Sequence, residues 1–477
     1  MKTLLIRPPD PMGMVDILSH TEPTNIGYIA SYAISKGFTI DIWDYEQHLF
    51  QAKSFLDRIK AYRPAVVGLS CMTPTIISGH NIATLIKDFF PEIIVVVGGA
   101  HSSAMPHETL LEFPNFDLVV NQEGEITFAE VLARAASNES LEDIAGTTRR
   151  DGESIITLPP RDFIKNLDDV PFPARELYHG QGQLAGHSSR GFSNSLRTTE
   201  IFTSRGCPYQ CTFCAIVATF NRSLRFRSME NVSEEIRHVK ERYDIQHFVI
   251  ADDTFGLKKG RLESLCEVFD KLQVSSWSCD TRIDVVDKRS LRLMKDSGCT
   301  KIAFGVETGS QRIADLNKKN ISLENVEPVI RWANEIGIRH IEANFIIGSH
   351  PDETIEDLEA TRKLIRELPL SFISISIIVP YPGTPNYEYM NDRNYIQTKD
   401  WENYVMFGQT PGWRTTNFSP KNLLTYQKKL NRSFYLRPSY IARMGSRIRS
   451  IEELRYYSKS GIAFLKWLFG FDLFSQR

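Results

Sequence analysis

Short apolar runs alternate with helical patterns over the first 140 residues. Each run has five or six residues and ends near small or polar positions, and a helical pattern near Ile26–Ser35 separates the first two. Such runs with helices between them predict strands of a parallel sheet covered on both faces. We therefore predict an α/β fold that begins with a doubly wound, Rossmann-type sheet over residues 1–140. The predicted strands are Thr3–Arg7, Phe38–Trp43, Val66–Ser70 and Ile93–Val97.

A second series of strand and helix patterns follows over residues 196–390. Six βα repeats predict a partial (β/α)6 barrel, and barrels of this kind carry functional residues at the carboxyl ends of their strands. The predicted strands are Glu200–Thr203, His247–Asp252, Trp277–Arg282, Lys301–Val306, His340–Ile347 and Phe372–Val379.

The remaining segments flank this barrel. Residues 141–195, first rich in proline and acidic residues and then in glycine and serine, predict a linker. Its second part is either a loop over an active site or a solvated connection. Residues 391–477 predict a helical C-terminal region, with helices near Leu423–Phe434 and Ile451–Tyr457.

Composition narrows the class of protein. The chain has 477 residues, of which 42% are hydrophobic and 24% charged, as in soluble globular proteins. A net charge of −2 argues against a nucleic-acid partner. We expect a cytoplasmic protein with no transmembrane segment, because no apolar run of about 18 residues occurs. The apolar stretch Ile462–Phe469 is either a helix that docks on its own protein or a peripheral contact with a membrane surface.

Three of the seven cysteines stand close together in the run TSRGCPYQCTFCAI. They are Cys207, Cys211 and Cys214. Thiolates select iron–sulfur clusters, zinc or copper(I), and three thiolates on a four-iron cubane leave one iron open to an outside ligand. The alternative is a structural zinc site, which needs a fourth ligand that no nearby residue supplies. The other cysteines are predicted to be buried core residues: Cys71, Cys266, Cys279 and Cys299.

The CxxxCxxC spacing, with Phe213 before the last cysteine, resembles the signature of the radical SAM superfamily. The resemblance implies that the three cysteines hold a 4Fe-4S cluster and that S-adenosylmethionine (SAM) binds the open iron. The cluster then cleaves SAM to a 5′-deoxyadenosyl radical. FVIADDTF and GVETGS resemble two further segments of this family. They imply SAM contacts from Phe213, Asp252, Asp253, Glu307 and Thr308, although one of the two aspartates could instead be a helix cap.

The N-terminal region is similar to the cobalamin-binding domain that precedes the radical domain in one branch of this superfamily. The similar segments are PTNIGYIASYAISKGF, VVGLS, VVVGGAHSSAMPHETL and FDLVVNQEGEITFAEVL. The resemblance implies that cobalamin binds near Ser70, Thr73, Gly98 and Gly99. The DxHxxG element that supplies a cobalt-binding histidine in some of these domains is absent, and His101 is interpreted as a loop residue.

This branch contains class B radical SAM methylases and anaerobic oxidative cyclases. The resemblance therefore implies an enzyme that uses cobalamin to methylate an unactivated carbon of a small biosynthetic substrate, with an electron donor such as flavodoxin or ferredoxin. One alternative is a radical SAM dehydratase, cyclase or rearrangement enzyme without methyl transfer, for example on an aminosugar or a tetrapyrrole. Another is a non-catalytic, metal-stabilised binding protein. The catalytic residues and the substrate stay open.

Overall fold

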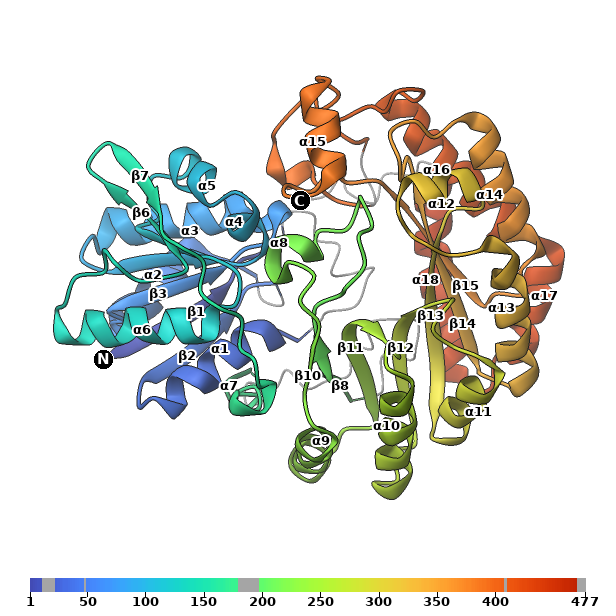
Figure 1. The fold of residues 1–477 in the computed structure, drawn as a ribbon, viewed down its shortest axis with the longest axis horizontal. Coiled ribbons are helices and arrows are strands. Elements are labelled where there is room, and N and C mark those ends of the chain that lie inside the picture. The colour runs from blue at the N-terminus through green and yellow to red at the C-terminus, as the bar shows by residue number, and fades with distance from the viewer. Residues whose placement is uncertain (11–21, 47–48, 179–196, 407–409, 470–477) are drawn as a thin grey trace. The chain divides into compact units, whose positions relative to one another are not determined.

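The structure, a computed structural model, describes residues 1–10, 22–46, 49–178, 197–406 and 410–469. It divides into two units, which are described separately (Figure 1). The first comprises residues 1–184, 215–227 and 381–383, and the second comprises residues 185–214, 228–380 and 384–477. The boundaries predicted at residues 140, 195 and 390 stay predictions, and the glycine- and serine-rich stretch 179–195 lies outside the described residues.

The first unit is built on a seven-stranded sheet with the order β2-β1-β3-β4-β5-β6-β7. Strands β1 to β5 are parallel, which confirms the predicted doubly wound sheet. The hairpin of β6 and β7 adds two antiparallel strands that the sequence pattern did not predict. The strands are β1 (Lys2–Arg7), β2 (Thr39–Asp44), β3 (Val66–Ser70), β4 (Ile94–Gly98), β5 (Leu118–Val120), β6 (Thr147–Asp151) and β7 (Ser154–Thr157).

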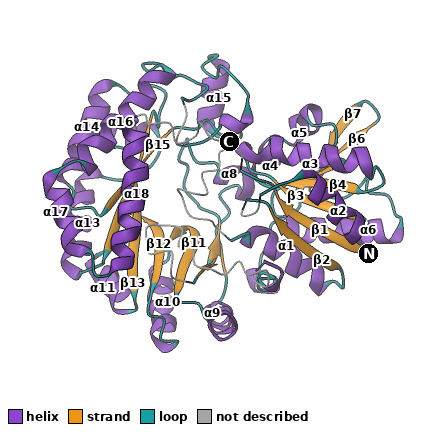
Figure 2. Ribbon diagram, turned by 180° about the vertical axis from the view of Figure 1, so that it is seen from behind, coloured by secondary structure: helices purple, strands orange, loops and turns teal. Residues whose placement is uncertain are grey.

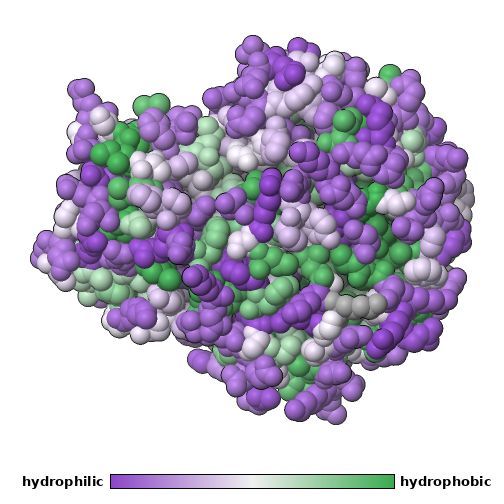
Figure 3. Space-filling view, viewed as in Figure 1, coloured by the Kyte–Doolittle hydropathy of each residue, from purple (hydrophilic) through white to green (hydrophobic). Residues whose placement is uncertain are grey.

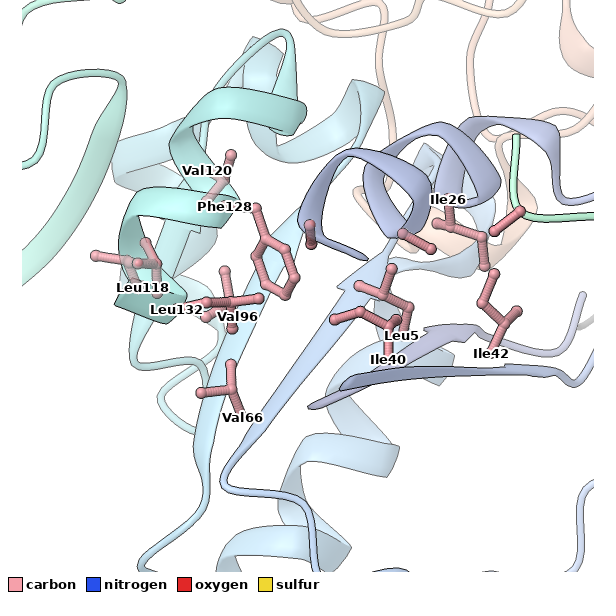
Figure 4. Close-up of a cluster of buried hydrophobic side chains, with 14 of the residues drawn as sticks. Leu5, Ile26, Ile40, Ile42, Val66, Val96, Leu118, Val120, Phe128 and Leu132 are labelled. Atoms are coloured by element: carbon pink, nitrogen blue, oxygen red, sulfur yellow. The ribbon is translucent and has the colours of Figure 1, made fainter. Parts of the chain in front are cut away.

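A hydrophobic cluster joins this sheet to three of its helices (Figure 4). Leu5 of β1 packs with Ile26 of helix α1 and Phe128 of helix α6, and each is at most 3% exposed. Leu4 and Ile6 are equally buried and point to the opposite face, because side chains alternate along a strand. The helices of this unit are α1 (Thr24–Ser35), α2 (Ala52–Tyr62), α3 (Ile76–Phe89), α4 (Ala100–Ala104), α5 (Pro106–Glu112), α6 (Gly124–Ser137), α7 (Glu176–Tyr178) and α8 (Ile216–Phe220).

The second unit contains six parallel strands in the order β15-β14-β13-β12-β11-β8, which confirms the predicted partial barrel. Among the described residues, β8 and β15 are the two outer strands of this sheet. Hydrophobic residues gather over these strands on the face shown in Figure 3, and hydrophilic residues cover the outer helices. The strands are β8 (Thr198–Ile201), β11 (His247–Phe255), β12 (Trp277–Arg282), β13 (Cys299–Glu307), β14 (His340–Ile347) and β15 (Phe372–Ile377). The short strand β9 (Ser204–Arg205) stands apart from this sheet, and β10 (Arg225–Phe226) belongs to the first unit.

Several helices of this unit begin at a side-chain cap, because the first N–H groups of a helix lack partners within it. Ser228, Asp287, Thr354 and Ser419 each accept such an N–H. The helices around the sheet are α9 (Met229–Tyr243), α10 (Lys259–Lys271), α11 (Lys288–Asp296), α12 (Gln311–Leu316), α13 (Val326–Ile336), α14 (Ile355–Glu367) and α15 (Pro385–Asp392).

The C-terminal region is helical, as predicted, and it packs on the second sheet (Figure 2). It consists of α16 (Pro420–Tyr435), α17 (Pro438–Arg447) and α18 (Ile451–Phe469). Helix α18 continues well beyond Tyr457, where the sequence pattern placed its end. None of the helices in the described ranges combines the length and the apolar composition that crossing a membrane requires.

Candidate active site

The three motif cysteines lie on one loop that follows β8, called here the cysteine loop (residues 206–214). Cys207 is buried, whereas Cys211 and Cys214 are partly open to solvent. The loop turns tightly, with the Cys214 N–H donating to the Cys211 carbonyl at 3.2 Å. All three thiols are free of disulfides, so the donor set that the sequence predicts is present on a single short segment.

Two aspartates in the second half of β11 hold the start of this loop. The buried carboxylate of Asp252 accepts hydrogen bonds from the N–H and hydroxyl groups of both Thr203 and Ser204, at 2.6 to 3.1 Å. Asp253 accepts the Gly206 N–H at 2.8 Å. Burial raises the pKa of Asp252, and these hydrogen bonds oppose the shift. Asp252 therefore positions the chain that enters the loop, and SAM contacts by either aspartate stay predictions.

The other end of the loop is held at Thr212, between Cys211 and Cys214. Its N–H donates to the Asn317 carbonyl, its carbonyl accepts the Asn386 N–H, both at 3.1 Å, and its hydroxyl donates to Asn317 Oδ1 at 2.9 Å. Both asparagine amides then bind Ser349. Asn317 and Ser349 are fully buried. The loop backbone is thus fixed by protein groups on both sides of Thr212.

A buried ion pair lies beside the cysteine loop. Lys319 Nζ donates to Glu307 Oε1 at 2.8 Å, and the two side chains are 8% and 11% exposed. Lys319 Nζ also lies 5.9 Å from the centre of the Phe213 ring. Burial alone would lower the pKa of Lys319, but Glu307 and Cys211 outweigh it and raise that pKa. Lys319 therefore stays a cation next to the thiols.

Glu307 occupies a strained position. Its φ of 69° is in the left-handed region, which few residues other than glycine adopt. Such strain persists where the surrounding structure enforces it, often at functional sites. A Cβ on the neighbouring Gly305 would lie 2.5 Å from Glu307 Oε1, so the carboxylate folds back over the strand where a glycine leaves room.

A second cation approaches the loop from β12. The Arg282 guanidinium stacks on the Tyr209 ring at 3.6 Å, forms two hydrogen bonds of 2.9 Å to Asp284, and donates to the Lys319 carbonyl at 2.7 Å. Burial raises the pKa of the Cys211 thiol, and Lys319 and Arg282 act against that shift. Positive charge beside the loop favours thiolates, the form that binds metals.

Thr308 follows Glu307 but lies deeper. It is 1% exposed, accepts the Ser310 N–H at 3.2 Å and lies 3.4 Å from the Thr361 hydroxyl. A Cβ on the adjacent Gly309 would come within 2.5 Å of Thr361 Cα. The predicted SAM contact of Thr308 stays a prediction, and its visible role is to pack β13 against α14.

The predicted cobalamin residues lie at the carboxyl edge of the first sheet. The strand order 2-1-3-4-5 reverses winding direction between β1 and β3, and open α/β sheets bind ligands at such a switch point. Ser70 and Gly98 are register neighbours at the ends of β3 and β4. The Ser70 hydroxyl accepts from Asn25 at 3.0 Å. Thr73 follows β3, so the structure gathers the four predicted residues at one edge.

Internal packing explains part of this edge. Gly99 has a φ of 103°, and a Cβ there would lie 2.4 Å from the Cys71 carbonyl oxygen. Glycine is therefore required at position 99 because the chain after β4 passes close to the chain after β3. His101 is buried, with Nδ1 3.4 Å from the Thr73 hydroxyl, and burial lowers its pKa to about 4. His101 lies on α4 rather than in a loop, so that interpretation is corrected.

Sequence reasoning missed Asn317, Lys319 and Asn386. All three are polar residues in polar stretches, which gave no indication that they would be buried against the cysteine loop. Among the described residues, no three His, Cys, Asp or Glu side chains converge to hold a single metal ion. A cubane does not require that convergence, because each thiolate binds a different iron.

Comparisons with known proteins decide the family. A model of the radical SAM superfamily matches residues 201–365, and a model of the B12 binding domain matches residues 13–132. The chain is a radical SAM enzyme with an amino-terminal B12-binding domain. The matched ranges contain the cysteine loop, the Glu307–Lys319 pair and the carboxyl edge of the first sheet.

Relatives of this radical SAM enzyme extend over nearly its whole length. An uncharacterised methyltransferase of Pyrococcus horikoshii is 29% identical and covers 92% of this chain and 94% of its own. An anaerobic magnesium-protoporphyrin IX monomethyl ester cyclase of Rubrivivax gelatinosus is 26% identical and covers 85% and 72%. The structure of the radical SAM methyltransferase TsrM from Kitasatospora setae was solved with cobalamin and a [4Fe-4S] cluster bound. It matches this fold with a TM-score of 0.71 and 17% sequence identity, over 92% of this chain and 89% of its own.

The family's cofactors are a 4Fe-4S cluster, SAM and cobalamin, and the residues present fit the cluster. Three soft thiol donors share one loop, that loop is held in shape by protein hydrogen bonds, and two cations stand beside it. Cys207, Cys211 and Cys214 would hold the cluster. For cobalamin the fit rests on the switch point, where Ser70 and Gly98 end β3 and β4 in half-buried positions.

Proposed function

We propose that this radical SAM enzyme is a cobalamin-dependent methyltransferase that acts on an unactivated carbon of a small biosynthetic substrate. When bound, the cluster and SAM supply hydrogen-atom abstraction, and cobalamin supplies the methyl group. The observation that carries the proposal is the cysteine loop, preorganised beside the Glu307–Lys319 pair in a chain that also has a B12-binding domain. The methyltransferase of Pyrococcus horikoshii supports methyl transfer by likeness.

Different residues of the chain would bind the cluster, SAM and cobalamin. The three cysteines would hold the cluster, and Asp252 with Thr212 keeps their loop in place. Glu307 would bind a hydroxyl or ammonium group of SAM through charge-assisted hydrogen bonds, while Lys319 neutralises its charge. Ser70 and Thr73 would bind polar edges of cobalamin. We expect a cytoplasmic enzyme that receives electrons from a flavodoxin or ferredoxin.

Anaerobic turnover tests the proposal. The enzyme is reconstituted with iron, sulfide and hydroxocobalamin, then supplied with SAM, a reductant and candidate substrates. Each methylation should release one 5′-deoxyadenosine, one methionine and one S-adenosylhomocysteine. Cys211→Ala should lose iron and SAM cleavage, whereas Cys266→Ala, which removes a buried thiol from α10, should keep both. Deoxyadenosine production by Cys211→Ala would contradict the ligand assignment.

A second candidate is a radical SAM cyclase or dehydratase without methyl transfer. The missing DxHxxG element and the likeness to the cyclase of Rubrivivax gelatinosus favour it. The same assay separates the two functions. Deoxyadenosine formed without S-adenosylhomocysteine, by an enzyme that takes up no hydroxocobalamin, would support the second candidate and reject the first.

A further inference from the structure

The C-terminal helix α18 has two apolar faces, of which the inner one is docked on the protein. Tyr457 stacks on Phe372 of β15 with ring centres 6.3 Å apart, and the Phe464 ring meets Tyr435 of α16 edge-on at 4.8 Å. Leu468 is fully buried. These contacts account for one side of the helix and fix its orientation.

The outer side of α18 carries an exposed apolar stripe. At about 100° of rotation per residue, five large apolar side chains fall within an arc of about 80° on the outer side. The outer face of a docked helix is normally polar, so this stripe requires another explanation. Its members, with their exposed fractions, are Ile451 (69%), Leu454 (50%), Ile462 (56%), Leu465 (40%) and Phe469 (54%).

Basic residues line one edge of this stripe. Arg455, Lys459 and Lys466 occupy the adjoining arc, about 40° to 80° from Ile451, and all three are exposed. Among the side chains that the structure describes, none forms an ion pair with Arg455, Lys459 or Lys466. Of the two glutamates of α18, Glu452 falls beside the basic edge, about 100° from Ile451, and Glu453 is turned away and pairs with Arg339. The outer face therefore combines apolar side chains with positive charge, although the whole chain has a net charge of −2.

We propose that the outer face of α18 docks the second unit on the surface of an anionic lipid bilayer. An amphipathic helix with a basic edge lies in the interface plane, where apolar side chains enter the acyl boundary and Lys and Arg meet anionic headgroups. Figure 2 shows α18 running along the surface of this unit. A second copy of the chain fits less well, because the stripe covers roughly 270 Å² and a stable dimer buries about 800 Å² on each partner.

Vesicle co-sedimentation of the full-length enzyme tests this surface. Vesicles of phosphatidylcholine alone are compared with vesicles that also contain phosphatidylglycerol. We expect binding to the anionic vesicles only, and weaker binding as salt is added. Lys459→Gln with Lys466→Gln should weaken it about 25-fold, since each basic residue contributes about fivefold. Ile462→Ser with Leu465→Ser should weaken it at least tenfold.

Ile355→Ser is the matched control, because Ile355 is 50% exposed on α14 of the same unit. This variant should bind like the wild type, and all variants should keep their circular dichroism and SAM cleavage. Equal sedimentation of the wild type and Ile462→Ser/Leu465→Ser would overturn the proposal, as would indifference to phosphatidylglycerol. Light scattering that finds a wild-type dimer, made monomeric by Ile462→Ser/Leu465→Ser, would identify the stripe as a subunit interface instead.

Discussion

Removing Lys319 should leave Glu307 as a buried charge without its cation. The pair is joined at 2.8 Å with both side chains about one-tenth exposed, so solvent screens it little. Removing one partner of such a pair typically costs about 3–5 kcal/mol. We therefore expect Lys319→Met to lower the free energy of unfolding of the second unit by about 3–5 kcal/mol. Glu307→Gln should destabilise it similarly, because a buried ammonium is then left alone.

The double variant separates pairing from packing. In Glu307→Gln with Lys319→Met both charges are gone, and only an unsatisfied amide is left, which costs about 1–3 kcal/mol. The double variant should therefore be more stable than either single variant. It should still cleave SAM poorly, because the predicted SAM-binding carboxylate is missing. Stability and activity would then respond differently to the same pair of substitutions.

Urea unfolding measured by tryptophan fluorescence is the suitable assay. Five of the six tryptophans lie in the second unit, so fluorescence mainly reports the unit that holds the pair. The measurement uses protein without added iron or sulfide, so that cluster loss does not contribute. Arg331→Met is the control, since Arg331 and Glu327 form a surface pair, 55% and 46% exposed, worth about 0–1 kcal/mol. Additive losses in the double variant would refute the reasoning.

Three further substitutions test the surroundings of the site. Asn317→Ala removes the side-chain contacts to Thr212 and Ser349 and should cost about 1–3 kcal/mol and lower the iron retained after reconstitution, measured by colorimetric iron assay; unchanged iron would exclude its role in holding the loop. Gly309→Ala would place a Cβ 2.5 Å from Thr361 and should destabilise the second unit in urea, whereas the open Gly260 should tolerate the same change. Burial raises the pKa of Glu353 to about 8, above its unfolded value, so wild-type stability should fall between about pH 5 and pH 8 by up to about 1.4 kcal/mol per pH unit, and Glu353→Gln should flatten that dependence. An equal loss of stability with rising pH in the wild type and in Glu353→Gln would contradict this prediction.

The strands could be predicted because the pattern that identifies each strand lies within a few consecutive residues. Val66–Ser70 and His340–Ile347 were predicted to the residue, since buried parallel strands are largely apolar runs bounded by turns. The end of α18 was predicted too early. Its apolar residues face both inward and outward, which obscures the period of a one-sided helix.

The site was only partly predictable, for a physical reason. The cysteine spacing can be read from one short stretch of sequence. The predictions for Asp252, Asp253 and Glu307 also rested on short stretches of sequence. The partners of the loop come from far along the chain: Asn317 binds Thr212 across 105 residues. A polar run such as LNKKN is normally solvated, and only the folded barrel brings it beneath the cysteines.

The hydrogen bonds to Thr212 have a consequence for repair of the iron–sulfur cluster. In a zinc finger the metal organises its own binding segment, so losing the ion unfolds the domain. Here carbonyl and amide groups of Asn317 and Asn386 bind the segment between the second and third cysteines through direct protein hydrogen bonds. We therefore expect an enzyme that has lost its cluster to oxygen to keep the shape of this loop. Rebuilding the cluster would then require new iron and sulfide but no refolding of the protein.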